Sequence, residues 1–146
     1  MGTGRSRLIL FCDTSALIKL YIVETGSEEL KVRILEAEAV AVCRIAWAEA
    51  HAALSRRARE VPEDTSNIEQ AKAALAADWP HFVVVEIYQA LVERAGDYAE
   101  TFALRGYDSV QLAAAFETGR ISQSPIAFAC FDTRLNKAAK LLGMLC

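Results

Sequence analysis

The chain has 146 residues, of which 53% are hydrophobic and 24% are charged. That composition is typical of one globular domain with a substantial core, and it excludes a disordered chain. No apolar run is long enough to cross a bilayer, and no signal-peptide pattern follows the polar residues 1–7, so we expect a cytoplasmic protein without a membrane partner. The net charge of −3 does not by itself indicate a polyanionic partner.

Strand and helix patterns alternate along the chain. Apolar runs predict strands at residues 7–12, 40–43, 81–85 and 126–131. Caps and helical periodicity predict helices at residues 14–21, 25–36, 44–60, 66–77, 87–104, 107–118 and 133–142. Capping boxes predict the helix starts at residues 25 and 66. Gly96 is a possible break within the helix at 87–104, and Gly119 is expected to end the helix at 107–118. This alternation predicts an α/β fold, with a mostly parallel sheet covered on both faces, in a single domain spanning residues 1–146.

Two of the apolar runs lead directly into an aspartate. Leu8–Cys12 is followed by Asp13, and Ile126–Phe131 is followed by Asp132. An aspartate between a strand and a helix commonly caps the helix, and that reading stays open for both. Because open parallel sheets bind their ligands beyond the carboxyl ends of the strands, both aspartates are also candidate site residues.

Two further acids lie in otherwise apolar helical patterns. Glu49 has small and apolar neighbours on several faces, although a solvated helix face is an alternative. Asp108 could simply favour the positive end of a helix dipole. If all four acids lie about 6 Å apart, each like-charge pair costs roughly 2–3 kcal/mol at an effective dielectric constant of about 20. A divalent cation would offset that cost, and carboxylate oxygens suit Mg²⁺ or Mn²⁺. Such a site would suit phosphodiester hydrolysis.

Hydroxyl and basic residues accompany the four acids. The hydroxyl residues could orient water around a bound ion or could cap helices, and they are Thr14, Ser15, Ser109 and Thr133. The basic residues could contact a phosphate, and they are Arg105, Arg134 and Lys19. Residues 61–100 hold two basic and eight acidic side chains, so the rest of the chain has 14 basic and 11 acidic ones. One side of the molecule could therefore attract a polyanion, although an ordinary solvated surface is equally compatible with these numbers.

Four motifs in chain order resemble those of the PIN-domain ribonucleases, and closely those of the VapC-type toxins of toxin–antitoxin modules. They are residues 10–30 with Asp13, the helix with Glu49, residues 104–113 with Asp108, and residues 131–139 with Asp132. The resemblance implies a three-layer α/β/α sandwich with about five strands. It further implies RNA cleavage dependent on Mg²⁺ or Mn²⁺ with the four acids as the catalytic centre, a homodimer, and inhibition by a cognate antitoxin protein. In two details the chain differs, because Ser109 stands where Ala is common and few residues follow Gly143.

Three other functions are compatible with parts of the pattern. A PIN nuclease can act in RNA processing without an antitoxin, and a PIN-like module can bind RNA or protein without catalysis. A phosphotransferase of the haloacid-dehalogenase type also begins with a strand that ends in an aspartate. That chemistry normally needs a second aspartate two residues later, where this chain has Ser15.

Overall fold

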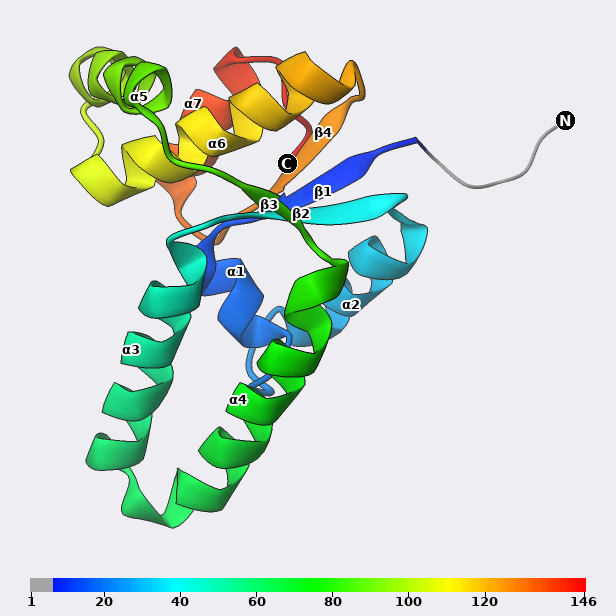
Figure 1. The fold of residues 1–146 in the computed structure, drawn as a ribbon, viewed down its shortest axis with the longest axis vertical. Coiled ribbons are helices and arrows are strands. Elements are labelled where there is room, and N and C mark those ends of the chain that lie inside the picture. Colours follow the sequence, from blue (N-terminus) through cyan, green and yellow to red (C-terminus); the bar gives the residue numbers. More distant parts are fainter. Residues whose placement is uncertain (1–6) are drawn as a thin grey trace, which may run out of the picture.

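A computed structural model describes residues 7–146, and Figure 1 shows its fold as a ribbon. Within residues 7–146 there are four strands: β1 (Ile9–Cys12), β2 (Ala39–Cys43), β3 (Val83–Val85) and β4 (Ile126–Ala129). The α-helices are α1 (Thr14–Lys19), α2 (Ser27–Glu36), α3 (Ala46–Glu60), α4 (Thr65–Asp78), α5 (Gln89–Phe102), α6 (Gly106–Ser122) and α7 (Thr133–Leu141). Two short 3₁₀ turns, η1 (Pro62–Asp64) and η2 (Trp79–His81), flank α4.

The four strands form one parallel sheet in the order β3-β2-β1-β4. Strand β1 is central, with Phe11 opposite Ala41 of β2 and Phe128 of β4. A single bridged residue, Leu145, extends the sheet beyond β4: its N–H donates to Ile126 O at 2.9 Å, and its carbonyl accepts from Phe128 N at 2.7 Å. The predicted parallel sheet is confirmed, but in place of the expected fifth strand residues 7–146 have only this one bridged residue.

Helices cover both faces of the sheet, which gives the predicted three layers (Figure 1). Side chains alternate along each strand, so Phe11 packs toward α5, α6 and α7, while Leu10 packs toward α1–α4. Both side chains are fully buried. The core therefore has two halves, one on each face of the sheet, and the strands are apolar throughout because both of their faces are buried.

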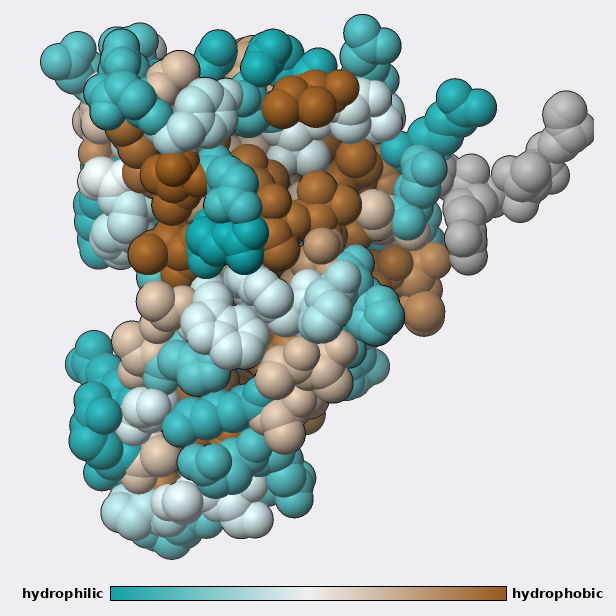
Figure 2. All heavy atoms as spheres, in the orientation of Figure 1, coloured by the Kyte–Doolittle hydropathy of each residue, from teal (hydrophilic) through white to brown (hydrophobic). Residues whose placement is uncertain are grey.

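Helices α3 and α4 form a hairpin that extends away from the sheet (Figure 1). A small cluster of Leu54, Ile68 and Ala71 fills the space between them. Figure 2 shows that the outer end of this hairpin is largely hydrophilic, whereas hydrophobic side chains gather on the same face of the molecule near the edge of the sheet. An apolar cavity of about 350 Å³ lies there, lined by β3 and the last turns of α6. No helix within residues 7–146 combines the length and the apolar character needed to span a bilayer.

Several predicted helix ends are wrong. Helix α6 does not stop at Gly119 but continues to Ser122, and α5 passes through Gly96 without a break. Neither predicted capping box forms: the cap of α2 is Gly26, in a left-handed conformation with φ 96°, and α4 begins at Thr65 with no side-chain cap. Helix ends are the least strongly determined parts of these elements, because the last turns fray and lack some of the hydrogen bonds of the helix interior.

Candidate functional site

The strand order places two of the predicted acids side by side. From β1 the chain crosses to β2 on one side, whereas β4 pairs with β1 on the other side. The carboxyl ends of β1 and β4 thus flank the point where the order reverses, which is where open α/β sheets bind ligands. Asp13 follows β1, and its N–H donates to Ala129 O, the last residue of β4, at 3.1 Å. Asp132 lies three residues beyond Ala129.

Asp13 and Asp132 each cap the helix that follows. Oδ1 of Asp13 accepts hydrogen bonds from Ala16 N at 2.9 Å and Ser15 Oγ at 2.8 Å. Oδ1 of Asp132 accepts from Leu135 N at 2.9 Å. These bonds fix both carboxylates relative to the backbone, so the capping reading of the sequence is correct and leaves a site role open.

Glu49 lies in the first turn of α3 and is held by two other elements. Thr14 Oγ1 donates to Glu49 Oε1 at 2.7 Å, and Gln111 Nε2 donates to the same oxygen at 3.1 Å. Glu49 is therefore half-buried and held by hydrogen bonds, rather than fully solvated on a helix face. Its carboxylate joins the start of α1, the start of α3 and the second turn of α6.

Asp108 and Asp132 line one polar cleft of about 450 Å³. Two of the predicted phosphate-contacting residues, Arg105 and Arg134, line the same cleft, as does Thr133. Arg134 donates to Ala103 O at 3.1 Å, and Arg105 donates to the Tyr107 hydroxyl at 3.0 Å. Both arginines are exposed, so each guanidinium keeps further donors toward solvent.

The pKa values of two carboxyl groups, those of Asp13 and Asp108, indicate that the four acids influence one another electrostatically. Burial and then the charges of Asp132, Asp13 and Glu49 raise the pKa of Asp108, against the lowering effect of Arg105. Burial also raises the pKa of Asp13, which is only 5% exposed. Hydrogen bonds from Ala16, Ser15 and Cys130 oppose that shift, and the charge of Glu49 adds to it. The acids therefore lie within electrostatic reach of one another.

These acids do not form a closed metal cage. Within residues 7–146, no three His, Cys, Asp or Glu side chains lie close enough together to hold an ion as they stand. The donor set nevertheless fits Mg²⁺ or Mn²⁺ in its chemistry, because it consists of carboxylates in a common unfavourable field. Mg²⁺ in particular uses few protein carboxylates and keeps several waters, so it needs no complete protein shell.

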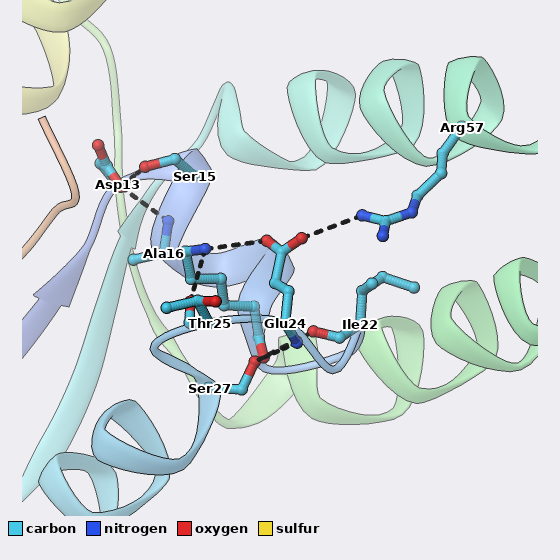
Figure 3. Close-up of polar contacts among 9 residues, drawn as sticks. Asp13, Ser15, Ala16, Ile22, Glu24, Thr25, Ser27 and Arg57 are labelled. Atoms are coloured by element: carbon cyan, nitrogen blue, oxygen red, sulfur yellow. Dashed lines mark hydrogen bonds and ion pairs between the residues drawn. The ribbon is translucent and has the colours of Figure 1, made fainter. Parts of the chain in front are cut away.

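Lys19 contacts the α1–α2 loop at Glu24 and Thr25, which Figure 3 shows together with Arg57. Its Nζ donates to Glu24 Oε1 at 3.1 Å and to Thr25 O at 2.9 Å, and it lies 4.6 Å from the centre of the Phe131 ring. Arg57 of α3 donates to the other Glu24 oxygen at 3.1 Å. Lys19 thus stabilises the loop, and its phosphate contact stays a prediction.

The remaining predicted hydroxyl residue, Ser109, bonds to its own helix. Its Oγ donates to Arg105 O at 2.9 Å, so it acts within α6. Two residues of the site were not predicted. Cys130 Sγ accepts from Asp132 N at 3.3 Å. Gln111 lies three residues after Asp108, a spacing that places both on one helix face and is the signal the sequence offered.

Comparison with known proteins identifies the class that this fold and site define. Residues 10–141 match the family model described as PIN domain. The chain therefore belongs to the PIN-domain family. It is also 31% identical over 135 residues to two proteins of Mycobacterium tuberculosis, Ribonuclease VapC45 of strain CDC 1551 / Oshkosh and Ribonuclease VapC49 of strain ATCC 25618 / H37Rv. Each alignment covers 92% of this chain and 92% of the relative.

Solved structures support the same fold. One is the crystal structure of M. tuberculosis VapC20, described as a sarcin–ricin loop cleaving toxin, with a TM-score of 0.64 and 19% identity. It matches over 88% of this chain and 94% of the VapC20 chain. Another is PAE2754 from Pyrobaculum aerophilum, with a TM-score of 0.58, 19% identity, and coverage of 98% of this chain and 86% of that one. At these identities the likeness supports the fold alone.

Proposed function

We propose that this PIN-domain protein is a Mg²⁺- or Mn²⁺-dependent endoribonuclease and the toxin of a toxin–antitoxin module. The observation that carries the proposal is the gathering of four acids at the switch point of the sheet: Asp108 and Asp132 line one cleft, and Thr14, the residue after Asp13, donates to Glu49. Two relatives named ribonucleases, which align over 92% of the chain, support RNA as the substrate.

Asp13 and Asp108 would hold the ion directly, and Glu49 and Asp132 would complete the shell or hold its waters. The ion, when bound, supplies charge neutralisation at the phosphate and a more acidic water. The protein's own part is positioning. Helix caps orient Asp13 and Asp132, and two donors orient Glu49, so the carboxylates need little reorganisation.

Arg105 and Arg134 would bind the RNA backbone on either side of the scissile phosphate. Both line the cleft that holds Asp108 and Asp132, and guanidinium groups match phosphate oxygens in geometry. Thr14, Ser15, Ser109 and Thr133 would support the ion's waters or the acids themselves. A water would then attack the phosphorus in line with the leaving oxygen.

The further parts of the proposal are the partners. A cognate antitoxin would bind this protein, since toxins of this class are paired with one. We also propose a homodimer, which the exposed apolar side chains Val83, Tyr88 and Ile121 near the sheet edge support. The RNA substrate would be met in the cytoplasm.

The test incubates purified protein with a panel of structured RNAs, with and without Mg²⁺ or Mn²⁺. We expect internal cleavage that EDTA abolishes, and loss of more than about 100-fold in rate for Asp13→Asn, since even outer-shell partners of a metal are worth 10–100-fold. Cleavage that survives both EDTA and Asp13→Asn would contradict the proposal. RNA binding without cleavage would instead indicate a binding module. Cleavage by a protein that has no antitoxin partner in its cell would indicate a nuclease of RNA processing.

A further inference from the structure

One buried amide, that of Gln111, contacts Glu49 and Thr14 at the site. Gln111 of α6 is 2% exposed. Its Nε2 donates to Glu49 Oε1 at 3.1 Å and to Thr14 Oγ1 at 3.2 Å. The three side chains come from α6, α3 and α1, and 97 residues separate Thr14 from Gln111. The amide therefore joins three helices at the site.

The neighbours determine which way the amide faces. Glu49 Oε1 is an acceptor, and Thr14 Oγ1 already uses its hydrogen in donating to that oxygen. An amide oxygen in place of Nε2 would meet two acceptors, so the nitrogen must face them. Gln111 Oε1 then points to the other side, where it is buried and has no hydrogen-bond partner among residues 7–146.

That unpaired oxygen is informative about the role of the residue. A buried acceptor without a partner lowers stability, so it offsets part of what the two donated hydrogen bonds contribute. What the amide supplies to the site is a donor to Glu49. Gln111 and Thr14 both donate to Oε1 of Glu49. Among residues 7–146, no donor bonds to its other oxygen, Oε2.

We propose that Gln111 is a positioning residue that holds Glu49 so that its Oε2 faces the divalent ion. The inference rests on the proposed function, because it concerns the same site. It assigns a role to a neutral residue that touches neither substrate nor ion and that acts only through Glu49.

The experiment measures Mn²⁺ binding by calorimetry together with thermal stability. The variant is Gln111→Met, which keeps the length of the side chain and removes both polar atoms. We expect Mn²⁺ to bind about 10-fold more weakly, the lower end of the effect of outer-shell partners, to a protein whose thermal unfolding without metal shows that it is folded. In a Glu49→Ala background, Gln111→Met should have no further effect on Mn²⁺ affinity, because the group that it positions is gone.

A matched control is Thr118→Val. Thr118 is a buried residue on the same helix, and its hydroxyl donates only to the helix carbonyl of Ala114 at 2.8 Å. We expect the Thr118→Val variant to bind Mn²⁺ with the affinity of the wild-type protein. Should Gln111→Met fail to fold, Thr14→Val removes the other donor to the same oxygen and should weaken Mn²⁺ binding similarly.

Two results would overturn the inference. One is a folded Gln111→Met protein with wild-type Mn²⁺ affinity, and the other is an equal loss with and without Glu49. A wild-type protein that cleaves RNA and binds Mn²⁺ keeps the proposed function in either case. A wild-type protein that binds no Mn²⁺ overturns both.

Discussion

At Asp108 the proposed chemistry and the stability of the fold make opposite demands. Burial and three neighbouring carboxylates raise the pKa of this side chain above its ordinary value of 3.8. The folded state then holds a proton that the unfolded state has already released, so stability falls as pH rises through the interval between the two pKa values. At neutral pH the fold bears the full loss of stability that the ionised Asp108 causes. This loss vanishes as the pH falls below 3.8, the ordinary pKa of the side chain.

We therefore expect Asp108→Asn to raise Tm at pH 7 in the absence of divalent ions, while it lowers RNA cleavage by more than about 100-fold. The gain in Tm should shrink as the pH approaches 3.8, because the wild-type carboxyl group is then protonated as well. Thermal denaturation of both proteins at several pH values measures this difference. An unchanged or lower Tm of the variant at pH 7 would contradict the shared field.

Single residues were predicted best where a local pattern fixes their position. Asp13 and Asp132 could be placed because each ends an apolar run, and both indeed follow the ends of adjacent strands. Whether each capped a helix or formed a site could not be decided, and the structure has both as caps. The role of Gln111 could not be predicted, since its partners lie 62 and 97 residues away.

Among the elements, two helical glycines make a matched pair. A Cβ at position 119 of α6 would lie 2.9 Å from Ile126 Cγ1, whereas nothing lies within 4 Å of one at position 96 of α5. We expect Gly119→Ala to lower the free energy of unfolding by about 1–2 kcal/mol, because overpacking outweighs the gain in helix propensity. Gly96→Ala should raise it by about 0.5–1 kcal/mol. Urea denaturation measures both, and equal effects of the same sign would contradict this packing.

The α1–α2 loop depends on one carboxylate with two cationic partners. Although burial opposes the shift, hydrogen bonds from Lys19 and Arg57 hold the pKa of Glu24 below its ordinary value of 4.5. The stabilisation is therefore present above pH 4.5 and is lost as pH falls through the lowered pKa. We expect Glu24→Gln to lower the free energy of unfolding by about 1 kcal/mol at pH 7, and by less in high salt, because salt screens the ion pairs.

The control for Glu24→Gln is Glu28→Gln on the neighbouring helix. Glu28 is 86% exposed and pairs with Lys31 at 3.7 Å. Its replacement should change the free energy of unfolding by less than about 0.5 kcal/mol. Equal losses of unfolding free energy in the two variants would show that the contacts of Glu24 with Lys19 and Arg57 add no specific stability to the loop.

The order of elements could be predicted from the sequence, but their ends could not. Buried strands have an apolar run of their own, so all four were found. Gly119 looked like a helix stop, yet α6 continues past it because the absent Cβ lets Ile126 pack closely there. Thr25 fitted a capping box, yet Gly26 caps α2, where φ is 96° and a Cβ would lie 2.7 Å from Cε1 of Phe131, both of which favour glycine.

For the whole molecule, the parallel sheet brings distant residues to one edge. Residues 13 and 132 begin helices after neighbouring strands, and α3 and α6 bring Glu49 and Asp108 into the same field. The alternation of strand and helix predicted this architecture because both faces of each strand are apolar. The position of the acids along the edge depended on the strand order, which alternation alone does not determine.

The most direct test of this account is a crystal structure of the protein soaked in Mn²⁺, with the ion located by its anomalous scattering. We expect a peak between Asp13 and Asp108, with Glu49 and Asp132 directed toward the ion or its waters, and we expect Asp13→Asn crystals to lose it. Mn²⁺ bound only elsewhere, in a protein that still cleaves RNA, would contradict the account.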